Sequence, residues 1–233
     1  MIKLDIPIFV IHYTKLIERK QYLEPILEKK YSRFKFINEY DKETLEKDVV
    51  NKSYIKDKNE FERKIIELWK IRNEQYRELS SGELSCFFKH LEALKLISNS
   101  NFEYSLIIED DVIPVNDFDV KINKTMKFMK NKKWDVIFLG QGIGKNFLNQ
   151  KLGFKRVFPN PQIVNHPASN CADSYIVKKD VAQKLLTNFR NFHLSYDWEL
   201  AYQMYKLNLD VYWCTRPMFT QGSKTGSYDS ALR

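Results

Sequence analysis

Cysteine and histidine, the residues of disulfide frameworks and zinc motifs, are sparse in this sequence. The three cysteines, Cys86, Cys171 and Cys214, lie far apart and form no C-x-x-C pair. No two of the four histidines have the spacing of a metal motif such as H-E-x-x-H. We therefore expect neither a disulfide framework nor a zinc motif. An odd, sparse set of cysteines is typical of reduced thiols in a cytosolic protein.

Long apolar runs are also missing. No run approaches the roughly 20 apolar residues that a membrane-spanning helix needs. The N-terminal stretch lacks the basic-then-apolar pattern of a secretory signal, because Asp5 and Pro7 interrupt it. We expect a cytoplasmic protein whose basic residues permit peripheral contact with an anionic membrane.

Basic residues outnumber acidic ones by 38 to 30, which gives a formal net charge of +8. Such a charge suits acidic partners, namely nucleotide diphosphates, nucleic acid or an anionic membrane surface. The lysines are scattered and no block of five like charges occurs, so solvated surfaces account for most of the excess. Hydrophobic residues make up 43% of the 233 residues, which is enough for a substantial core.

Apolar strands alternate with helical patterns along the chain, which predicts one α/β domain over residues 1–233. We expect strands at residues 6–11, 34–37, 104–112, 134–140, 173–177 and 209–214, the first of them central. We expect helices at about 16–30, 80–97, 119–130, 181–189 (capped by Asp180) and 197–207. Residues 43–79 are charged and predict a helical excursion, and residues 145–170 are irregular, as in a lid or binding loop.

The stretch Y-S-L-I-I-E-D-D-V, residues 104–112, carries the strongest functional signal. Its apolar run predicts a strand buried on both faces, and ligands bind beyond the carboxyl ends of such strands. Strand alternation places Glu109 and Asp111 on one face and Asp110 on the other. Adjacent carboxylates repel each other unless a cation relieves them, and hard oxygen ligands suit Mg²⁺ or Mn²⁺ on a diphosphate. We interpret the acids as a metal–diphosphate site; the alternative is a solvated acidic turn.

Arg19 and Asp41 follow the first two predicted strands closely. Arg19 lies in the first turns of a helix, either as a phosphate or base contact or as an ordinary surface arginine. Asp41 lies where an acid can bind ribose hydroxyls. As an alternative, Asp41 caps the helical segment that follows it.

The helix at 80–97 offers two candidates, each with a structural alternative. Ser80 and Glu83 match a capping box, so Glu83 is first a cap and only second a ligand. His90 is by default a satisfied interior histidine. As an alternative, His90 orients the acids of the strand that follows.

Asp197 and Glu199 fall in the first turn of a later helix, within S-Y-D-W-E-L. The helix dipole favours acids at this position, which is a structural explanation. The functional interpretation makes one of them a general base held on a rigid element. The polar, glycine-containing stretch after Pro217 is expected to fold back over the site.

Several segments together resemble glycosyltransferase family 25, which includes bacterial lipooligosaccharide galactosyltransferases and collagen galactosyltransferase domains. They are I-F-V-I-H-Y with Arg19, G-E-L-S-C-F-F-K-H-L-E-A-L, I-I-E-D-D-V, W-D-V-I-F-L-G, S-Y-I-V-K-K-D-V-A-Q-K-L-L, D-W-E-L, and a tail with Pro217, Gln221 and Ser227. They occur in the family's order and cover most of the chain. The sequence departs from the family pattern at Lys89, usually serine, at Ser85, often glycine, and at His12 and Tyr13, usually Asn-Leu.

The resemblance implies a GT-A-like, Rossmann-like mixed sheet flanked by helices that binds a UDP-sugar. Residues 109–111 would be the D-x-D-like motif, with Glu109 and Asp111 on Mn²⁺ or Mg²⁺. It also implies an inverting transfer, usually of galactose from UDP-galactose, to a glycan or protein hydroxyl, as in lipopolysaccharide biosynthesis. Asp197 matches the family's acid in its region and is the expected base, with Glu199 as second choice. The residues expected to bind the donor are Arg19, Asp41, Glu83, His90, Asp110 and Gln221.

Three other functions compete with glycosyl transfer on the sequence alone. A nucleic-acid-binding protein needs a clustered basic face with interleaved aromatics, whereas acids lie at the best pocket here, so no nucleic-acid partner is expected. A two-metal phosphohydrolase or nuclease usually needs more converging acids and histidines. The last is a catalytically impaired module that keeps the fold to bind a nucleotide sugar or nucleic acid. Asp197 and the acids at 109–111 argue against this module, whereas Lys89 keeps it open as an alternative.

Overall fold

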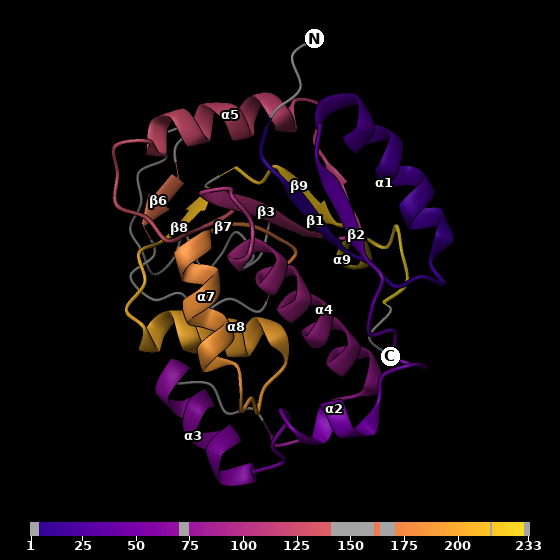
Figure 1. The fold of residues 1–233 in the computed structure, drawn as a ribbon, viewed down its shortest axis with the longest axis vertical. Helices are drawn as coiled ribbons and strands as arrows, with labels where there is room; N and C mark the ends of the chain where they lie inside the picture. Colours follow the sequence, from indigo (N-terminus) through magenta and orange to yellow (C-terminus); the bar gives the residue numbers. More distant parts are fainter. Residues whose placement is uncertain (1–4, 70–74, 141–160, 164–170, 215, 231–233) are drawn as a thin grey trace.

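A mixed β-sheet runs through the computed structural model, which describes residues 5–69, 75–140, 161–163, 171–214 and 216–230. The strands are β1 (Ile8–Ile11), β2 (Phe34–Ile37), β3 (Tyr104–Glu109), β4 (Val112–Pro114), β5 (Val136–Phe138), β6 (Pro161–Ile163), β7 (Ser174–Lys178), β8 (Val211–Cys214) and β9 (Phe219–Gln221). Seven of them form one sheet in the order β2-β1-β3-β7-β5-β8-β6, and β4 pairs with β9 separately (Figure 1). β1 is parallel to β2 and β3, whereas β7 is antiparallel to β3 and β5.

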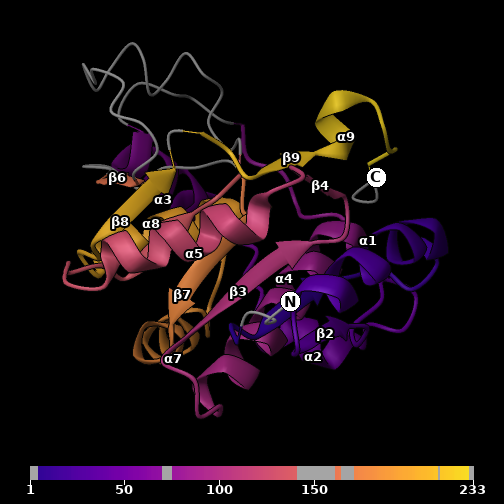
Figure 2. The ribbon, with the colours of Figure 1, turned by 90° about the horizontal axis from the view of Figure 1, so that it is seen from above.

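Helices cover both faces of the seven-stranded sheet. They are α1 (Ile17–Lys30), α2 (Lys47–Asn51), α3 (Lys58–Trp69), α4 (Ser81–Ser98), α5 (Phe118–Met129), α7 (Lys179–Asn188), α8 (Tyr196–Lys206) and α9 (Gly222–Thr225). α1 and α5 lie on one face, and α4, α7 and α8 lie on the other (Figures 1 and 2). The predicted α/β fold, a GT-A-like mixed sheet flanked by helices, is therefore confirmed. Within the described ranges, every helix is too short or too polar to cross a bilayer.

Alternating side chains along the strands fill two hydrophobic cores, one under each layer of helices. In β3, Leu106 and Ile108 pack in the core beneath α1 and α5, whereas Ile107 packs in the core beneath α4, α7 and α8. All three side chains are fully buried. The unbroken apolar run of β3 therefore arises because both of its faces are covered by helices, as predicted.

Two local predictions are wrong, and one lies mostly outside the described residues. The first strand is not central, because β7 holds the middle of the sheet and only β2 lies beyond β1. An apolar run reports burial but carries no information on strand order. The N-cap of α7 is Lys178 rather than Asp180, which lies in the first turn. Of the irregular stretch at 145–170, only β6 is described.

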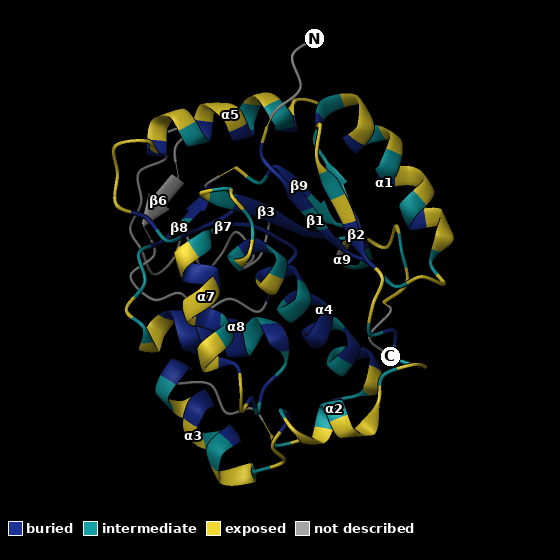
Figure 3. Cartoon of the chain, in the orientation of Figure 1, coloured by how far each residue is buried: buried dark blue, intermediate teal, exposed yellow. Residues whose placement is uncertain are grey.

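The charged stretch at 43–79 contains α2 and α3, which confirms helices there. α3 turns a buried face toward the body of the protein and leaves its other face exposed (Figure 3). On that buried face, Phe61 and Ile65 form a small core with Leu194. Helix α3 is therefore attached to the main body chiefly through the region around α8.

A buried ion pair strengthens this attachment. Lys64 Nζ of α3 lies 2.6 Å from Glu199 Oε1 of α8, and both side chains are buried. Because each charge has lost its hydration, removing either partner would leave the other charge buried without compensation. The two helices are thus coupled by charge as well as by apolar packing.

We expect the Lys64→Met substitution to lower the free energy of unfolding by about 3–5 kcal/mol, because it leaves the Glu199 carboxylate buried without its cation. Adding Glu199→Gln should restore part of the loss. Urea denaturation of the single and double variants measures both effects. Lys58→Met, which removes an exposed lysine from the same helix, is the control and should change stability by less than about 1 kcal/mol. Equal losses for Lys64→Met and Lys58→Met would show that the pair contributes nothing.

Candidate active site

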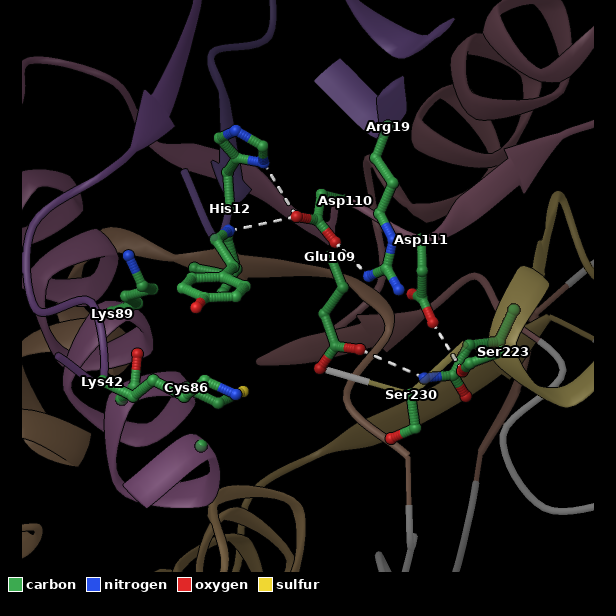
Figure 4. A pocket seen from close by; sticks show the side chains of 15 residues that line it. His12, Arg19, Lys42, Cys86, Lys89, Glu109, Asp110, Asp111, Ser223 and Ser230 are labelled. Carbon is green, nitrogen blue, oxygen red and sulfur yellow. Dashed lines mark hydrogen bonds and ion pairs between the residues drawn. The ribbon is translucent and has the colours of Figure 1, made fainter. Parts of the chain in front are cut away.

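The carboxyl ends of β1 and β3 meet at a cavity of about 600 Å³, counting the space at its mouth. The two strands are parallel, so their ends lie at the same edge of the sheet, where ligands are expected. Ionisable side chains occupy much of the lining (Figure 4): His12, Arg19, Lys42, Lys89, Glu109, Asp110 and Asp111. The predicted acidic triplet therefore faces a cavity instead of forming a solvated turn.

Asp110 turns toward β1 and α1, where protein groups compensate its charge. Its Oδ1 accepts a hydrogen bond from Arg19 Nη1 at 2.8 Å. Its Oδ2 lies 2.8 Å from His12 Nδ1 and accepts the backbone N–H of Tyr13 at 3.1 Å. Such charge-assisted hydrogen bonds stabilise the ionised carboxylate in a buried setting. Asp110 therefore holds α1 and the end of β1 in place. Both of its carboxylate oxygens accept hydrogen bonds from protein groups.

Glu109 ends β3, and its carboxylate is directed away from that of Asp110 (Figure 4). Its Oε2 accepts a hydrogen bond from Gln221 Nε2 at 3.2 Å, and its Oε1 lies 3.5 Å from His90 Nε2. Burial, followed by the negative charges of Asp111 and other nearby acids, raises the pKa of Glu109 well above its usual range. A cation at this position would stabilise the ionised form of Glu109 and so oppose the rise in its pKa.

Asp111 is 5% exposed and only half satisfied. Its Oδ2 accepts a hydrogen bond from Ser223 Oγ at 2.6 Å, whereas its buried Oδ1 receives none from any described residue. Burial raises the pKa of Asp111, and the Ser223 hydrogen bond opposes the rise. A buried carboxylate oxygen without a donor is costly unless a ligand binds it. Asp111 and Glu109 thus fit a hard divalent cation, for which carboxylate oxygens are the preferred ligands.

His90 is fully buried on α4, with its ring stacked on Tyr196 at 3.8 Å between centroids. Its Nδ1 lies 3.2 Å from Tyr175 Oη, and its Nε2 faces Glu109 without a hydrogen bond from any described residue. Burial lowers the pKa of His90 to about 3, so the ring is neutral at physiological pH. The Cys86 sulfur, His90 Nε2 and a Glu109 oxygen lie within 4.8 Å of one another, a group able to hold a metal ion.

Asp41 is held by a buried lysine and a threonine. Its Oδ1 accepts a hydrogen bond from Lys89 Nζ at 2.7 Å, and the Thr14 hydroxyl donates to Oδ2. Burial alone would raise the pKa of Asp41, but the hydrogen bonds from Lys89 and Thr14 lower it overall. The alternative role of Asp41 as a helix cap is wrong, since Glu46 is the N-cap of α2.

Glu83 forms the predicted capping box at the start of α4. The Ser80 hydroxyl accepts the Glu83 N–H, and the Glu83 carboxylate accepts the Ser80 N–H. Arg77 donates to both carboxylate oxygens of Glu83. The capped turn carries Gly82 and Ser85, which line the cavity. Glu83 therefore shapes the cavity by fixing the end of α4.

Glu199 lies deep in the protein, away from the residues that line the cavity. Its Oε1 accepts hydrogen bonds from Lys64 and from Gln203 Nε2, at 2.6 and 2.9 Å. Its Oε2 accepts the backbone N–H groups of His193 and Leu194. Both oxygens are thus engaged in holding α3 and the start of α8.

Asp197 is half-buried in the first turn of α8. Its Oδ1 accepts hydrogen bonds from Ser195 Oγ at 2.7 Å and from the Trp198 N–H at 3.0 Å. Asp197 is also outside the set of lining residues, but its negative charge is among those that raise the pKa of Glu109. Of the two predicted base candidates, Asp197 is therefore the one electrostatically close to the acidic triplet.

The C-terminal segment folds back over the cavity, as predicted. β9 pairs with β4, and the Gly222 N–H donates to the Asp111 carbonyl at 2.8 Å. A Cβ on Gly222 would lie 2.4 Å from the Tyr228 ring, so this approach requires glycine. The Arg19 guanidinium lies over the Tyr228 ring, 5.1 Å from its centroid. Asp111 and Arg19 therefore anchor the segment at both of its ends.

Three residues of the site, His12, Cys86 and Ser223, were not predicted from the sequence. A signal existed for His12, because it directly follows β1, whose end lies beside that of β3 in any parallel pair. Cys86 and His90 are one helical turn apart on α4, a pair of residue types that belongs to neither the C-x-x-C nor the H-E-x-x-H motif. Ser223 gave no signal, since 112 residues separate it from Asp111.

Comparison with known proteins agrees with the geometry. The sequence profile of glycosyltransferase family 25 (LPS biosynthesis protein) matches residues 5–200. Procollagen galactosyltransferase 2 of Homo sapiens is 30% identical over 112 residues, which are 47% of this chain and 17% of the relative. The protein of the same name in Mus musculus matches with the same identity and coverage. The match thus spans about a sixth of the length of these curated relatives.

The family match extends over most of the chain and includes the acidic triplet at 109–111 and both acids of α8. It also includes β1, β3 and α4, the elements that bring the acids and their partners to one cavity. The match and the fold lead to the same conclusion: the chain belongs to glycosyltransferase family 25.

Proposed function

We propose that the chain is an inverting, metal-dependent galactosyltransferase, built as one GT-A-type domain over residues 1–233 with 43–79 as a variable helical excursion. It takes galactose from UDP-galactose and transfers it to a hydroxyl group of a glycan or protein. Family membership and the partial likeness to procollagen galactosyltransferase 2 support the choice of galactose. The family's description as an LPS biosynthesis protein supports a glycan acceptor.

The observation that carries the proposal is the buried Asp111 oxygen without a donor among the described residues, beside the partly buried Glu109 in the same cavity. Glu109 and Asp111 would hold Mn²⁺ or Mg²⁺. When bound, the cation supplies positive charge that stabilises the departing diphosphate. Asp110 is compensated by Arg19 and His12, so it adds little repulsion toward an anionic donor.

The remaining donor-binding residues act on the nucleotide or on the acids. Asp41, oriented by Lys89, lies beyond β2 and is proposed to accept hydrogen bonds from the ribose hydroxyls. Gln221 and His90 both contact the Glu109 carboxylate and restrict its position. The indirect contributors are Arg19, through Asp110, and Glu83, through the cap of α4.

Asp197 is our candidate for the general base. It would accept the proton of the acceptor hydroxyl while that oxygen attacks the anomeric carbon from the face opposite the diphosphate. The bond to the diphosphate oxygen breaks as the new glycosidic bond forms, which inverts the anomeric centre. Two hydrogen bonds to Oδ1 orient the carboxylate, which is the support that a base on a rigid element needs.

We expect Asp111→Asn to abolish the metal-dependent stabilisation by UDP and to lower galactosyl transfer by about 100-fold or more, because the cation loses a ligand. Thermal shift with UDP, with and without Mn²⁺, and a transfer assay measure the two effects. Asp180→Asn removes an exposed acid from α7 and is the charge-matched control. Full activity of Asp111→Asn without metal would contradict the whole scheme.

We expect Asp197→Asn to lower kcat by about 100-fold or more while binding of UDP-galactose and Mn²⁺ is unchanged. The amide cannot take the proton but retains the shape and the hydrogen-bonding oxygen. Steady-state kinetics together with calorimetric titration of the donor separate the two quantities. Glu199→Gln is the comparison, and it should affect the free energy of unfolding more than kcat. Near-normal turnover of Asp197→Asn with intact donor binding would place the base elsewhere.

We expect the metal-free protein to lose stability as pH rises above the usual pKa range of glutamate. In that range the folded protein still keeps the Glu109 proton that the unfolded chain has released, so raising the pH favours unfolding. Mn²⁺ replaces this proton, so its stabilising effect should grow as the pH rises above the usual pKa range of glutamate. Melting curves across this range, with and without Mn²⁺, measure the effect. A pH dependence that survives unchanged in Glu109→Gln would assign it to another group.

A further inference from the structure

We propose that Cys86, His90 and Glu109 form a binding site for a borderline-soft transition-metal ion of the Zn²⁺ class. This site is distinct in ligand chemistry from the hard-cation site at Asp111. It lies where α4 passes the end of β3, and Cys86 and Glu109 both line the cavity. The binding proposed here does not depend on the galactosyltransferase function.

The ligand atoms are already close to the spacing that one ion requires. Cys86 and His90 are four residues apart on α4, so they lie on the same helix face one turn apart. Their ligand atoms and a Glu109 oxygen are all within 4.8 Å of one another. His90 Nε2 and Glu109 Oε1 are 3.5 Å apart, which is long for a hydrogen bond. Two ligands of one tetrahedral Zn²⁺ lie about 3.4 Å apart, from Zn–N and Zn–O bonds of about 2.1 Å.

His90 is held as a metal-binding histidine would be. Its Nε2 is completely buried and has no hydrogen-bond partner among the described residues, although it faces Glu109. On the other side of the ring, Nδ1 is 3.2 Å from Tyr175 Oη, which is 2.7 Å from Tyr196 Oη. A ligating histidine typically contacts an oxygen through its second nitrogen, which fixes the ring. The stacking of His90 on Tyr196 adds a further constraint on its orientation.

The chemistry of the three ligands selects the ion. Thiolate and imidazole favour Zn²⁺ and Co²⁺, whereas Mg²⁺ and Mn²⁺ prefer oxygen ligands. Three protein ligands would leave a fourth position, as in catalytic zinc sites, and two of the three, Cys86 and Glu109, line the cavity. Asp111 offers only oxygen atoms and therefore suits the harder ion. The two proposed sites share Glu109 and differ in their other ligands, which are sulfur and nitrogen in one site and oxygen in the other.

Glu109 belongs to both proposed sites. If the galactosyltransferase function is correct, Zn²⁺ bound by Cys86 and His90 would take the Glu109 carboxylate away from the hard cation. Zinc should then inhibit transfer, and inhibition should weaken in Cys86→Ser. This consequence rests on the proposed function, whereas the metal binding itself is measured without activity.

The test is titration of the full chain with Co²⁺, a spectroscopic substitute for Zn²⁺, followed by absorption. We expect a thiolate-to-cobalt charge-transfer band that is displaced by Zn²⁺, is lost in Cys86→Ser and persists in Asp111→Asn. His90→Gln should weaken the Co²⁺ affinity at least about 10-fold. Cys214→Ser changes a buried thiol of β8 and is the matched control, which should retain the band. Absence of the band in the unsubstituted chain, or its persistence in Cys86→Ser, would overturn the proposal.

A second measurement needs no substitution and so avoids the question of folding. Alkylation of the native chain followed by peptide mass analysis reports which thiol reacts. Cys86 is partly exposed, whereas Cys171 and Cys214 are buried, so the reagent reaches Cys86 first. Burial and the nearby acids raise the pKa of the Cys86 thiol, so the reaction is run at alkaline pH, where the thiolate forms. We expect Zn²⁺ to slow alkylation of Cys86 at least about 10-fold, whereas Mg²⁺ should not. Equal alkylation with and without Zn²⁺ would contradict the site, even in a chain that proves active with UDP-galactose.

Discussion

The charge of Asp110 ties together the segments that make the cavity. Its carboxylate contacts His12 from the end of β1 and Arg19 from α1, and Arg19 in turn holds the C-terminal segment through the Tyr228 ring. A buried carboxylate is tolerated only when paired and hydrogen-bonded. Because its partners come from separate elements, the contacts that satisfy this charge also fix the relative positions of those elements. The contacts that neutralise Asp110 thus hold β1, α1 and the C-terminal segment together at this edge of the sheet.

The acids on either side of Asp110, in contrast, are not neutralised by basic side chains in the described part of the chain. Asp111 Oδ1 and His90 Nε2 are buried atoms without hydrogen-bond partners among the described residues, and Glu109 is surrounded by other negative charges. Buried polar groups are normally satisfied, so the Asp111 oxygen in the cavity and the His90 nitrogen that faces Glu109 favour a site whose missing partner is a ligand. Stability is lowered locally in favour of binding, which is common at functional sites. Compensation at Asp110 and its absence at Glu109 and Asp111 distinguish the acid that holds the fold from the two that we propose as metal ligands.

The parts of this arrangement that depend on local pattern could be predicted from the sequence. The buried run of β3 and the capping box of Ser80 and Glu83 follow from residue spacing, because apolar periodicity and helix capping act over a few residues. Strand order could not be derived, since burial on both faces is common to β1, β3 and β7. The contacts of Asp111 with Ser223 and of Glu199 with Lys64 join distant segments and depend on how the helices pack. The acidic triplet and the opposite facing of Asp110 could therefore be predicted, but not the protein groups that each acid contacts.

Lys89 illustrates how such long-range contacts change the interpretation of a residue. A lysine where the family usually has serine raises the question of an impaired site, because it adds a buried positive charge. The structure shows the ammonium group 2.7 Å from Asp41 Oδ1, so the charge is compensated inside the protein. Thr14 holds the other oxygen of Asp41, and an ionised carboxylate has further lone pairs to accept hydrogen bonds from a ribose. The departure at Lys89 therefore changes how Asp41 is oriented and leaves the acids of β3 as they are, which favours a working site over a vestigial one.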